Sequence, residues 1–172
     1  SSDVHDEAKT FSGKLEKQKD SLVVNGEFGE TNPLQSFRGA QASHTIRPRE
    51  KICEFSSFST VRSRASCPSG SKGYYELEIV KLCAAPQFGF ASKGFRCIES
   101  STGEGVGDDD NSWGVDGARR RQWHNGPINE YGASWKIGDV IGFACDLDQN
   151  QIHVSVNGSF EAPNGLIFQL QP

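Results

Sequence analysis

The clearest pattern in the chain is the alternation of apolar and charged positions in YYELEIV, residues 74–80. Tyr75, Leu77 and Ile79 fall on one side of an extended strand, and the intervening glutamates fall on the other. A strand of this kind covers a core with one face and meets water with the other. The segment therefore predicts a half-buried β-strand.

A second pattern is apolar on both faces. In VIGFACDLD, residues 140–148, Ile141, Phe143 and Cys145 alternate with three residues that are also apolar or small. We therefore expect a central strand, covered on both sides. A Gln-Asn turn follows, and QIHVSV, residues 151–156, returns with apolar side chains at every second position.

Shorter strand-like segments separated by turn signals recur through the rest of the chain. LVVNG begins at residue 22, and APQFGFAS carries Phe88 and Phe90 on one face. Helical periodicity is almost absent. These features predict an all-β fold, an antiparallel β-sandwich of two sheets.

The first 21 residues differ in composition from the rest of the chain, because they are polar and rich in charge. Phe11 and Leu15 stand four positions apart and could form the apolar stripe of one short helix. We predict that residues 1–21 form an N-terminal extension, either a short helix or a linker, and that residues 22–172 form one domain.

Net charge and apolar runs exclude two classes of function. A formal net charge of −4 argues against nucleic-acid binding through a broad basic surface. No stretch approaches the roughly 18 apolar residues that a membrane span requires.

The number and spacing of the cysteines indicate the redox state of the compartment in which the protein resides. The chain has 5 cysteines, which stand singly and include no CxxC pair. They make a poor disulfide framework and a poor zinc site, so we predict a reducing, cytoplasmic environment. The chain contains no methionine, and we expect it to be part of a larger polypeptide or complex.

Four segments together resemble the SPRY domain family: YYELEI, SWGVDG, WKIGDVIGFACDLD and IHVSVNG, which occur here in that family's order. The resemblance is firm from Phe58 to Asn157 and looser from Leu22 to Phe168. It implies a bent, concanavalin-like jelly-roll sandwich of two antiparallel sheets that binds no cofactor. Members of the family use a rim of loops to bind a protein or a short peptide.

The chain departs from the family pattern at its C-terminus. One or two further strands normally follow the segment that ends here at Pro172. We expect either that those strands are missing from this sequence or that part of Leu22–Arg49 takes their position, since an unfilled position leaves backbone groups unpaired.

The most suggestive surface loop is GARRRQWHNG, residues 117–126. Arginine and tryptophan are the residue types that dominate binding energy at protein interfaces. We predict that the arginines pair with carboxylates or backbone carbonyls of a partner, and that two aromatic side chains supply buried area. The predicted partner-binding residues, chosen by loop position, are Arg62, Arg64, Phe95, Arg119, Arg120, Arg121 and Trp123. The alternatives for this loop are a phosphate contact or an ordinary solvated turn with Trp123 half-buried.

Metal and catalytic sites have weaker support. Asp108, Asp109 and Asp110 could bind calcium through clustered oxygen atoms, but a solvated loop is the preferred interpretation. DLDQN, from Asp146, imitates the start of an EF-hand loop and lacks the glycine and glutamate that the loop requires. No GxSxG or HExxH signature is present. We therefore predict no metal, no cofactor and no enzymatic activity.

The function predicted from the sequence is a non-catalytic module that binds a protein or peptide through its loop rim. Two alternatives remain open. The domain could be a structural subunit of a large multi-chain assembly, held by a wide interface. It could also bind a small ligand or a carbohydrate, since lectins use similar sandwiches.

Overall fold

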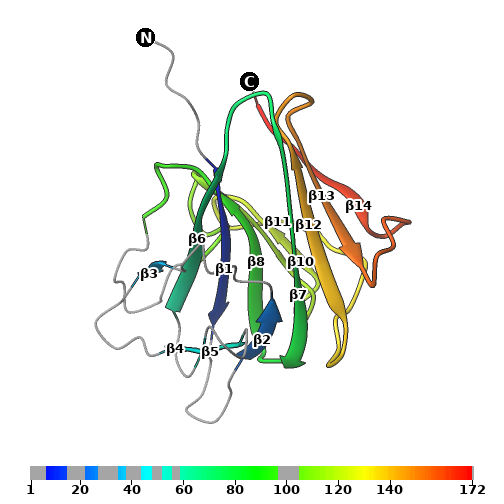
Figure 1. Cartoon of the computed structure of the whole chain (residues 1–172). Coiled ribbons are helices and arrows are strands. Elements are labelled where there is room, and N and C mark those ends of the chain that lie inside the picture. Colours follow the sequence, from blue (N-terminus) through cyan, green and yellow to red (C-terminus); the bar gives the residue numbers. More distant parts are fainter. Residues whose placement is uncertain are drawn as a thin grey trace.

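A computed structural model describes residues 7–14, 22–26, 35–37, 44–47, 52–55, 59–96 and 105–171. In these ranges every regular element is a β-strand. The strands form two antiparallel sheets of seven strands each (Figure 1). None of the described elements is a helix of the length and apolarity needed to cross a bilayer. The predicted all-β, two-sheet sandwich is confirmed.

The first sheet has the order β11-β10-β9-β8-β1-β6-β3. Its strands are β11 (Pro127–Glu130), β10 (Arg121–Trp123), β9 (Ser112–Asp116), β8 (Ala85–Ala91), β1 (Glu7–Lys14), β6 (Ser59–Cys67) and β3 (Gln35–Phe37).

The second sheet has the order β14-β13-β12-β7-β2-β5-β4. Its strands are β14 (Gly165–Gln169), β13 (Gln151–Val156), β12 (Val140–Asp146), β7 (Lys72–Lys81), β2 (Leu22–Gly26), β5 (Ile52–Phe55) and β4 (His44–Arg47).

The two strands that the hydrophobic pattern predicted most clearly are neighbours. In β7 the buried side chains are those on the Tyr75, Leu77 and Ile79 face, as the alternation indicates. β12 lies between β7 and β13, so it is a central strand. Phe143 of β12 lies opposite Tyr75 of β7, and their rings stack at 5.4 Å between centroids.

The core lies between the sheets and is dominated by aromatic rings. Tyr75 of the second sheet meets Phe90 of the first edge to face, with ring centroids 5.4 Å apart. Its buried hydroxyl donates to the Gly89 carbonyl at 2.7 Å, which satisfies the polar atom inside the core. Trp135 stacks on Phe88 of β8 at 5.0 Å. These contacts fix how the two sheets face each other.

The N-terminal prediction needs correction. Within residues 1–21, Glu7–Lys14 forms no helix but the strand β1, which pairs with β6 on one side and β8 on the other. A short helix with one apolar stripe is weak in isolation, whereas a strand placed between two others pairs its backbone groups on both sides. Residues 1–6 and 15–21 lie outside the described ranges.

The segment Leu22–Arg49 also contributes to the sandwich. β2 occupies an interior position of the second sheet, while β3 and β4 end the two sheets within the described part of the chain.

Candidate functional site

The turn between β9 and β10 is built around the side chain of Asp116. Its Oδ1 accepts hydrogen bonds from the backbone N–H groups of Ala118 and Arg119, both at 2.8 Å. Aspartate is favoured at such a position because its carboxylate caps the backbone of the turn that follows. Arg120 then adopts φ of 57°, in the left-handed region, and the chain reverses into β10.

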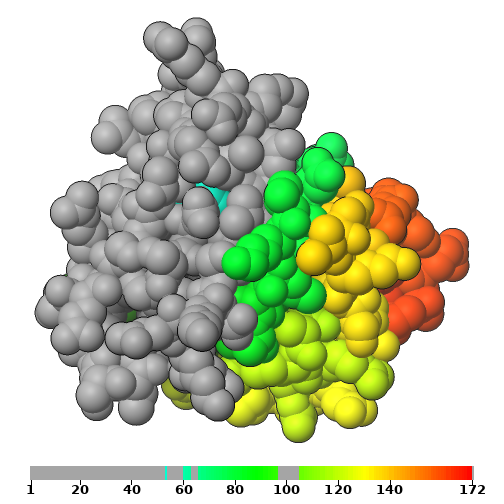
Figure 2. Space-filling model, turned by 90° about the horizontal axis from the view of Figure 1, so that it is seen from below, coloured from blue at the N-terminus to red at the C-terminus, as the bar shows by residue number. Residues whose placement is uncertain are grey.

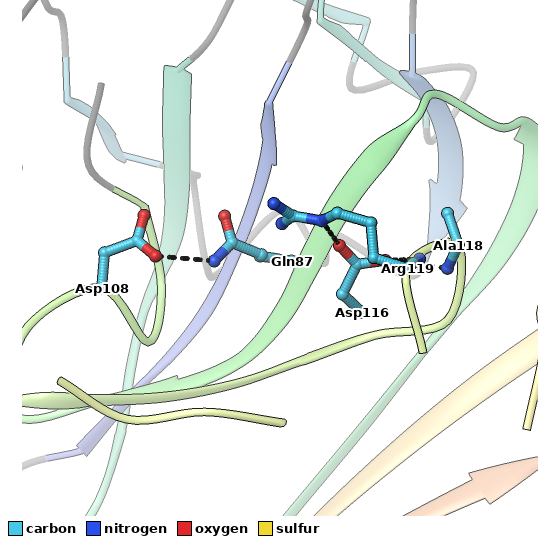
Figure 3. Close-up of polar contacts among 5 residues, drawn as sticks. All are labelled: Gln87, Asp108, Asp116, Ala118 and Arg119. Atoms are coloured by element: carbon cyan, nitrogen blue, oxygen red, sulfur yellow. Dashed lines mark hydrogen bonds and ion pairs between the residues drawn. The ribbon is translucent and has the colours of Figure 1, made fainter. Parts of the chain in front are cut away.

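The side chain of Arg119 folds back onto the turn and contacts both Asp116 and Trp123. Its Nε donates to Asp116 Oδ2, and the two form an ion pair in which the carboxylate is fully buried (Figure 3). Its guanidinium carbon lies 4.2 Å from the centre of the Trp123 ring. Burial raises the pKa of the Asp116 carboxyl above its ordinary value, and the positive charge of Arg119 opposes that rise.

A second polar pair lies beside this one. Gln87 of β8 donates from Nε2 to Asp108 Oδ1 at 3.0 Å, as Figure 3 shows. Oδ2 of the same carboxylate accepts the Gly105 N–H at 2.7 Å. These bonds attach the segment 105–110 to the face of the first sheet that points away from the core, which we call the outer face.

Two glycines allow that close approach. A Cβ on Gly114 of β9 would overlap the carbonyl oxygen of Val106, and a Cβ on Gly107 would overlap Cβ of Trp123. The backbone of segment 105–110 therefore lies directly on the sheet. Trp123 is enclosed between this segment and the Arg119 guanidinium, and it remains half-buried.

The strand register shows which predicted residues share the outer face. Trp123 lies opposite Gly114 of β9, which lies opposite Gly89 of β8. Gly89 pairs with Thr10 of β1, and Thr10 pairs with Arg62 of β6. Partners in a register row point to the same face, so Arg62 shares a face with Trp123, at a distance of roughly 19 Å for four strand spacings.

The remaining basic residues differ in exposure. Arg120 and Arg121 are exposed. Nη2 of Arg120 donates to the Gly132 carbonyl at 3.4 Å, while Arg121 lies opposite Asp116 and Glu130 in the ladder. These two guanidinium groups stand beside the Arg119–Trp123 pair and are open to solvent. Arg64 lies in β6, and its side chain is outside the described part of the structure.

The prediction for Phe95 is wrong. Its side chain is only 7% exposed and packs in a small apolar cluster with Ala91 and Val106. It contacts Val106 in the segment 105–110 and is not available to a partner. Loop position alone suggested exposure, whereas the pairing of Phe95 with Val106 depends on how the chain folds back.

Arg119 is also less available than expected, because its charge is used within the chain. The residue that explains this, Asp116, was not among the predicted site residues. A signal was present in the sequence: an aspartate that ends a strand, followed by Gly and then a basic residue at the third position, is typical of a side-chain-capped turn.

His124 is a further member of the region. Its ring stacks on Trp113 at 4.9 Å between centroids, and Nδ1 lies 2.9 Å from the Ser112 carbonyl oxygen. The histidine thus holds the end of β10 against β9.

The carboxylates of Asp108, Asp109 and Asp110 each accept a hydrogen bond from another residue of the chain. Asp108 binds Gln87, Asp109 accepts from Ser112, and the carboxylate of Asp110 accepts the Asn111 amide at 2.6 Å. Among the residues that the structure describes, no three His, Cys, Asp or Glu side chains are grouped to hold a metal ion.

Comparison with known proteins adds two findings. Residues 72–171 match the SPRY domain family. The chain is 33% identical over 138 residues to a protein of Arabidopsis thaliana named E3 ubiquitin-protein ligase RKP. That alignment covers 80% of this chain and 10% of the Arabidopsis protein, so the chain spans about a tenth of its relative's length.

Proposed function

The chain belongs to the SPRY domain family, and on that premise we propose that it binds a protein or peptide partner through the loop rim at the β9–β10 turn. The binding is non-catalytic. SPRY domains are generally interaction modules, and the proposal assigns the contact to a particular place on this one.

One observation carries the proposal: Arg120 in the turn and Arg121 at the start of β10 are exposed, and side-chain hydrogen bonds hold the turn itself. Asp116 caps that turn, and Arg119 fixes it against Trp123. A guanidinium held on an ordered backbone loses less conformational freedom when it pairs with a carboxylate or a carbonyl.

The charge of the whole chain makes this basic turn distinctive. The formal net charge is −4, yet three arginines follow one another in the turn and β10. We therefore expect the partner to present acidic side chains or free backbone carbonyls to the arginines. The half-buried face of Trp123 adds apolar area beside them.

The relative from Arabidopsis suggests a wider setting. Its printed name is that of a ubiquitin ligase, and it is about ten times as long as the aligned region. We place this chain, by analogy, as the partner-binding module of a larger polypeptide in the cytoplasm. Cys53 and Cys67 are buried and stand outside any disulfide, which supports a reducing compartment.

A pair of charge reversals tests the binding site. Arg121→Glu changes an exposed charge on β10, and Lys81→Glu changes an exposed charge at the end of β7 in the other sheet. Each variant and the native chain are used to capture partners from native lysate, with recovery quantified by mass spectrometry. We expect one captured partner protein whose recovery falls about tenfold with Arg121→Glu and is unchanged with Lys81→Glu. Equal recovery on all three chains would remove the β9–β10 turn from the binding surface.

Arg120→Gly is a second variant, one in which we expect the turn conformation and the stability of the fold to be preserved. Glycine adopts positive φ without steric cost, so the turn keeps its shape while the guanidinium is lost. Relief of the left-handed strain and the greater entropy of glycine in the unfolded chain nearly cancel, and we expect stability within about 0.5 kcal/mol of the native chain. Reduced partner recovery with unchanged stability would assign a direct role to Arg120.

A further inference from the structure

Large hydrophobic side chains are concentrated at one place on the second sheet. In the described part of the chain six such residues are exposed, and three of them, Tyr74 at 46%, Phe160 at 44% and Leu166 at 50%, line one groove. The groove has a volume of about 530 Å³. A concentration of exposed apolar side chains around a hollow is typical of an interaction surface rather than of ordinary solvent-facing sheet.

The groove follows from the register of four neighbouring strands. Tyr74 of β7 lies opposite Ala144 of β12, Ala144 lies opposite His153 of β13, and His153 lies opposite Leu166 of β14. All four point away from the core, because the alternate positions carry the core residues. In the view from below, β7, β12 and the segment that follows β13 are the green, orange and red regions (Figure 2).

The hollow lies where the side chains of this row are short. Ala144 has a short side chain, and it stands between Tyr74 on one side and His153, followed by Leu166, on the other. Phe160 adds an aromatic wall from the turn after β13. A space of this size between an aromatic ring and a leucine fits a bulky apolar side chain together with its backbone.

The surroundings of the groove are acidic. Glu76 and Glu78 are exposed on the outward side of β7, and Asp148 is exposed in the turn after β12. Among the residues that line the groove, Lys72 is the one lysine or arginine. Its Nζ lies 2.6 Å from Asp146 Oδ2, so its charge is paired within the chain. The unpaired charges around the groove are therefore negative, which favours a cationic partner.

We infer that this groove binds a basic peptide segment of a partner protein. One bulky apolar side chain lies over Ala144 between Tyr74 and Leu166, and flanking lysine or arginine residues pair with Glu76 and Asp148. The site is separate from the β9–β10 turn, which lies in the other sheet and carries the opposite charge. The inference therefore does not depend on the function proposed above.

A random dodecapeptide display library, selected on the folded chain, tests the inference. Leu166→Asp places a charge in the groove, and Ile137→Asp is the matched control, since Ile137 is 65% exposed and does not line the groove. The expected peptides carry a bulky apolar residue flanked by lysine or arginine. Synthetic copies should bind at least tenfold more weakly to Leu166→Asp and equally well to Ile137→Asp.

A second pair of variants tests the charge. Glu76→Lys should weaken the same peptides, whereas Glu130→Lys, an exposed glutamate of the first sheet, should not. Enrichment of acidic peptides, or of peptides indifferent to Leu166→Asp, would overturn the inference. Peptides that are lost only with Arg121→Glu would belong to the β9–β10 turn instead. Self-association of the native chain that Leu166→Asp abolishes, measured by sedimentation, would make a second copy the occupant and would also overturn it.

Discussion

The guanidinium of Arg119 lies over the indole ring of Trp123, with its central carbon 4.2 Å from the ring centre. The same guanidinium is ion-paired with the buried carboxylate of Asp116. One side chain thus ties the end of β9 to β10 through a charge contact and a cation–π contact. This arrangement gives the neighbouring, exposed arginines a fixed base.

Removal of Asp116 should destabilise the fold. Asp116→Ala loses three hydrogen bonds from Ala118 and Arg119 and leaves a cation that is only partly exposed without its partner. We expect the free energy of unfolding to fall by about 3 kcal/mol, measured by urea denaturation. Glu161→Ala, at an exposed position, should change it by less than about 0.5 kcal/mol. A comparable, small effect of both substitutions would show that the buried pair does not organise the turn.

Two glycines should respond differently to the same substitution. A Cβ on Gly89 of β8 would overlap the carbonyl oxygen of Trp113 in β9, so Gly89→Ala must separate two paired strands. A Cβ on Gly73 of β7 would lie 3.2 Å from the sulfur of Cys67, a side-chain atom that can shift. We expect Gly89→Ala to lower the thermal unfolding midpoint by many degrees and Gly73→Ala to lower it far less. The reverse order would contradict the packing of β8 on β9.

Cys53 should resist alkylation while the chain is folded. Its side chain is fully buried, and burial raises the pKa of the Cys53 thiol to about 12. At pH 8 only about one molecule in 10⁴ would carry the reactive thiolate. Mass spectrometry after iodoacetamide treatment should find Cys53 unmodified in buffer and modified in urea. Rapid modification in buffer would mean that β5 opens readily.

The Lys72–Asp146 pair predicts part of the acid response. The hydrogen bond from Lys72 lowers the pKa of the Asp146 carboxyl in the folded chain. The pair therefore stabilises the fold above the unfolded pKa of aspartate, about 3.9, and that contribution is lost as the pH falls through the lower, folded value. We expect the loss of stability between pH 6 and pH 2 to be smaller in Asp146→Asn than in the native chain. An identical loss would show that Asp146 does not titrate differently on folding.

The contribution of Asp116 to stability has the opposite dependence on pH. Burial raises the pKa of its carboxyl, so the folded chain takes up that proton more readily than the unfolded chain. Its contribution to stability is therefore greatest below the unfolded pKa and decreases as the pH rises through the folded value.

The sequence predicts the strands whose patterns are local. β7 and β12 follow from alternation, and the order of the four family segments leads to the two-sheet sandwich. The strand β1 could not be predicted in this way, because EAKTFSGK has no regular alternation of apolar and polar residues. Its assignment as a strand depends on pairing with β6 and β8, which are distant in sequence.

The site residues divide in the same way. The sequence shows the arginines and Trp123 as interface-type residues in a loop. It does not show that Asp116 forms an ion pair with Arg119, since Asp116 belongs to a segment that predicts a strand. The burial of Phe95 depends on Val106, across a loop. The groove on the second sheet is a row formed by four strands, and no segment of the sequence carries it alone.

Photo-crosslinking from single positions tests whether a partner protein binds at the β9–β10 turn. A photoreactive amino acid replaces Ala118, an exposed residue of the β9–β10 turn, in one chain and the exposed Lys81 in another. Both chains are irradiated in native lysate after folding is verified. We expect a discrete covalent adduct with one partner protein from position 118 and none from position 81. Adducts from position 81 alone, or the same adducts from both positions, would contradict a binding site at the β9–β10 turn.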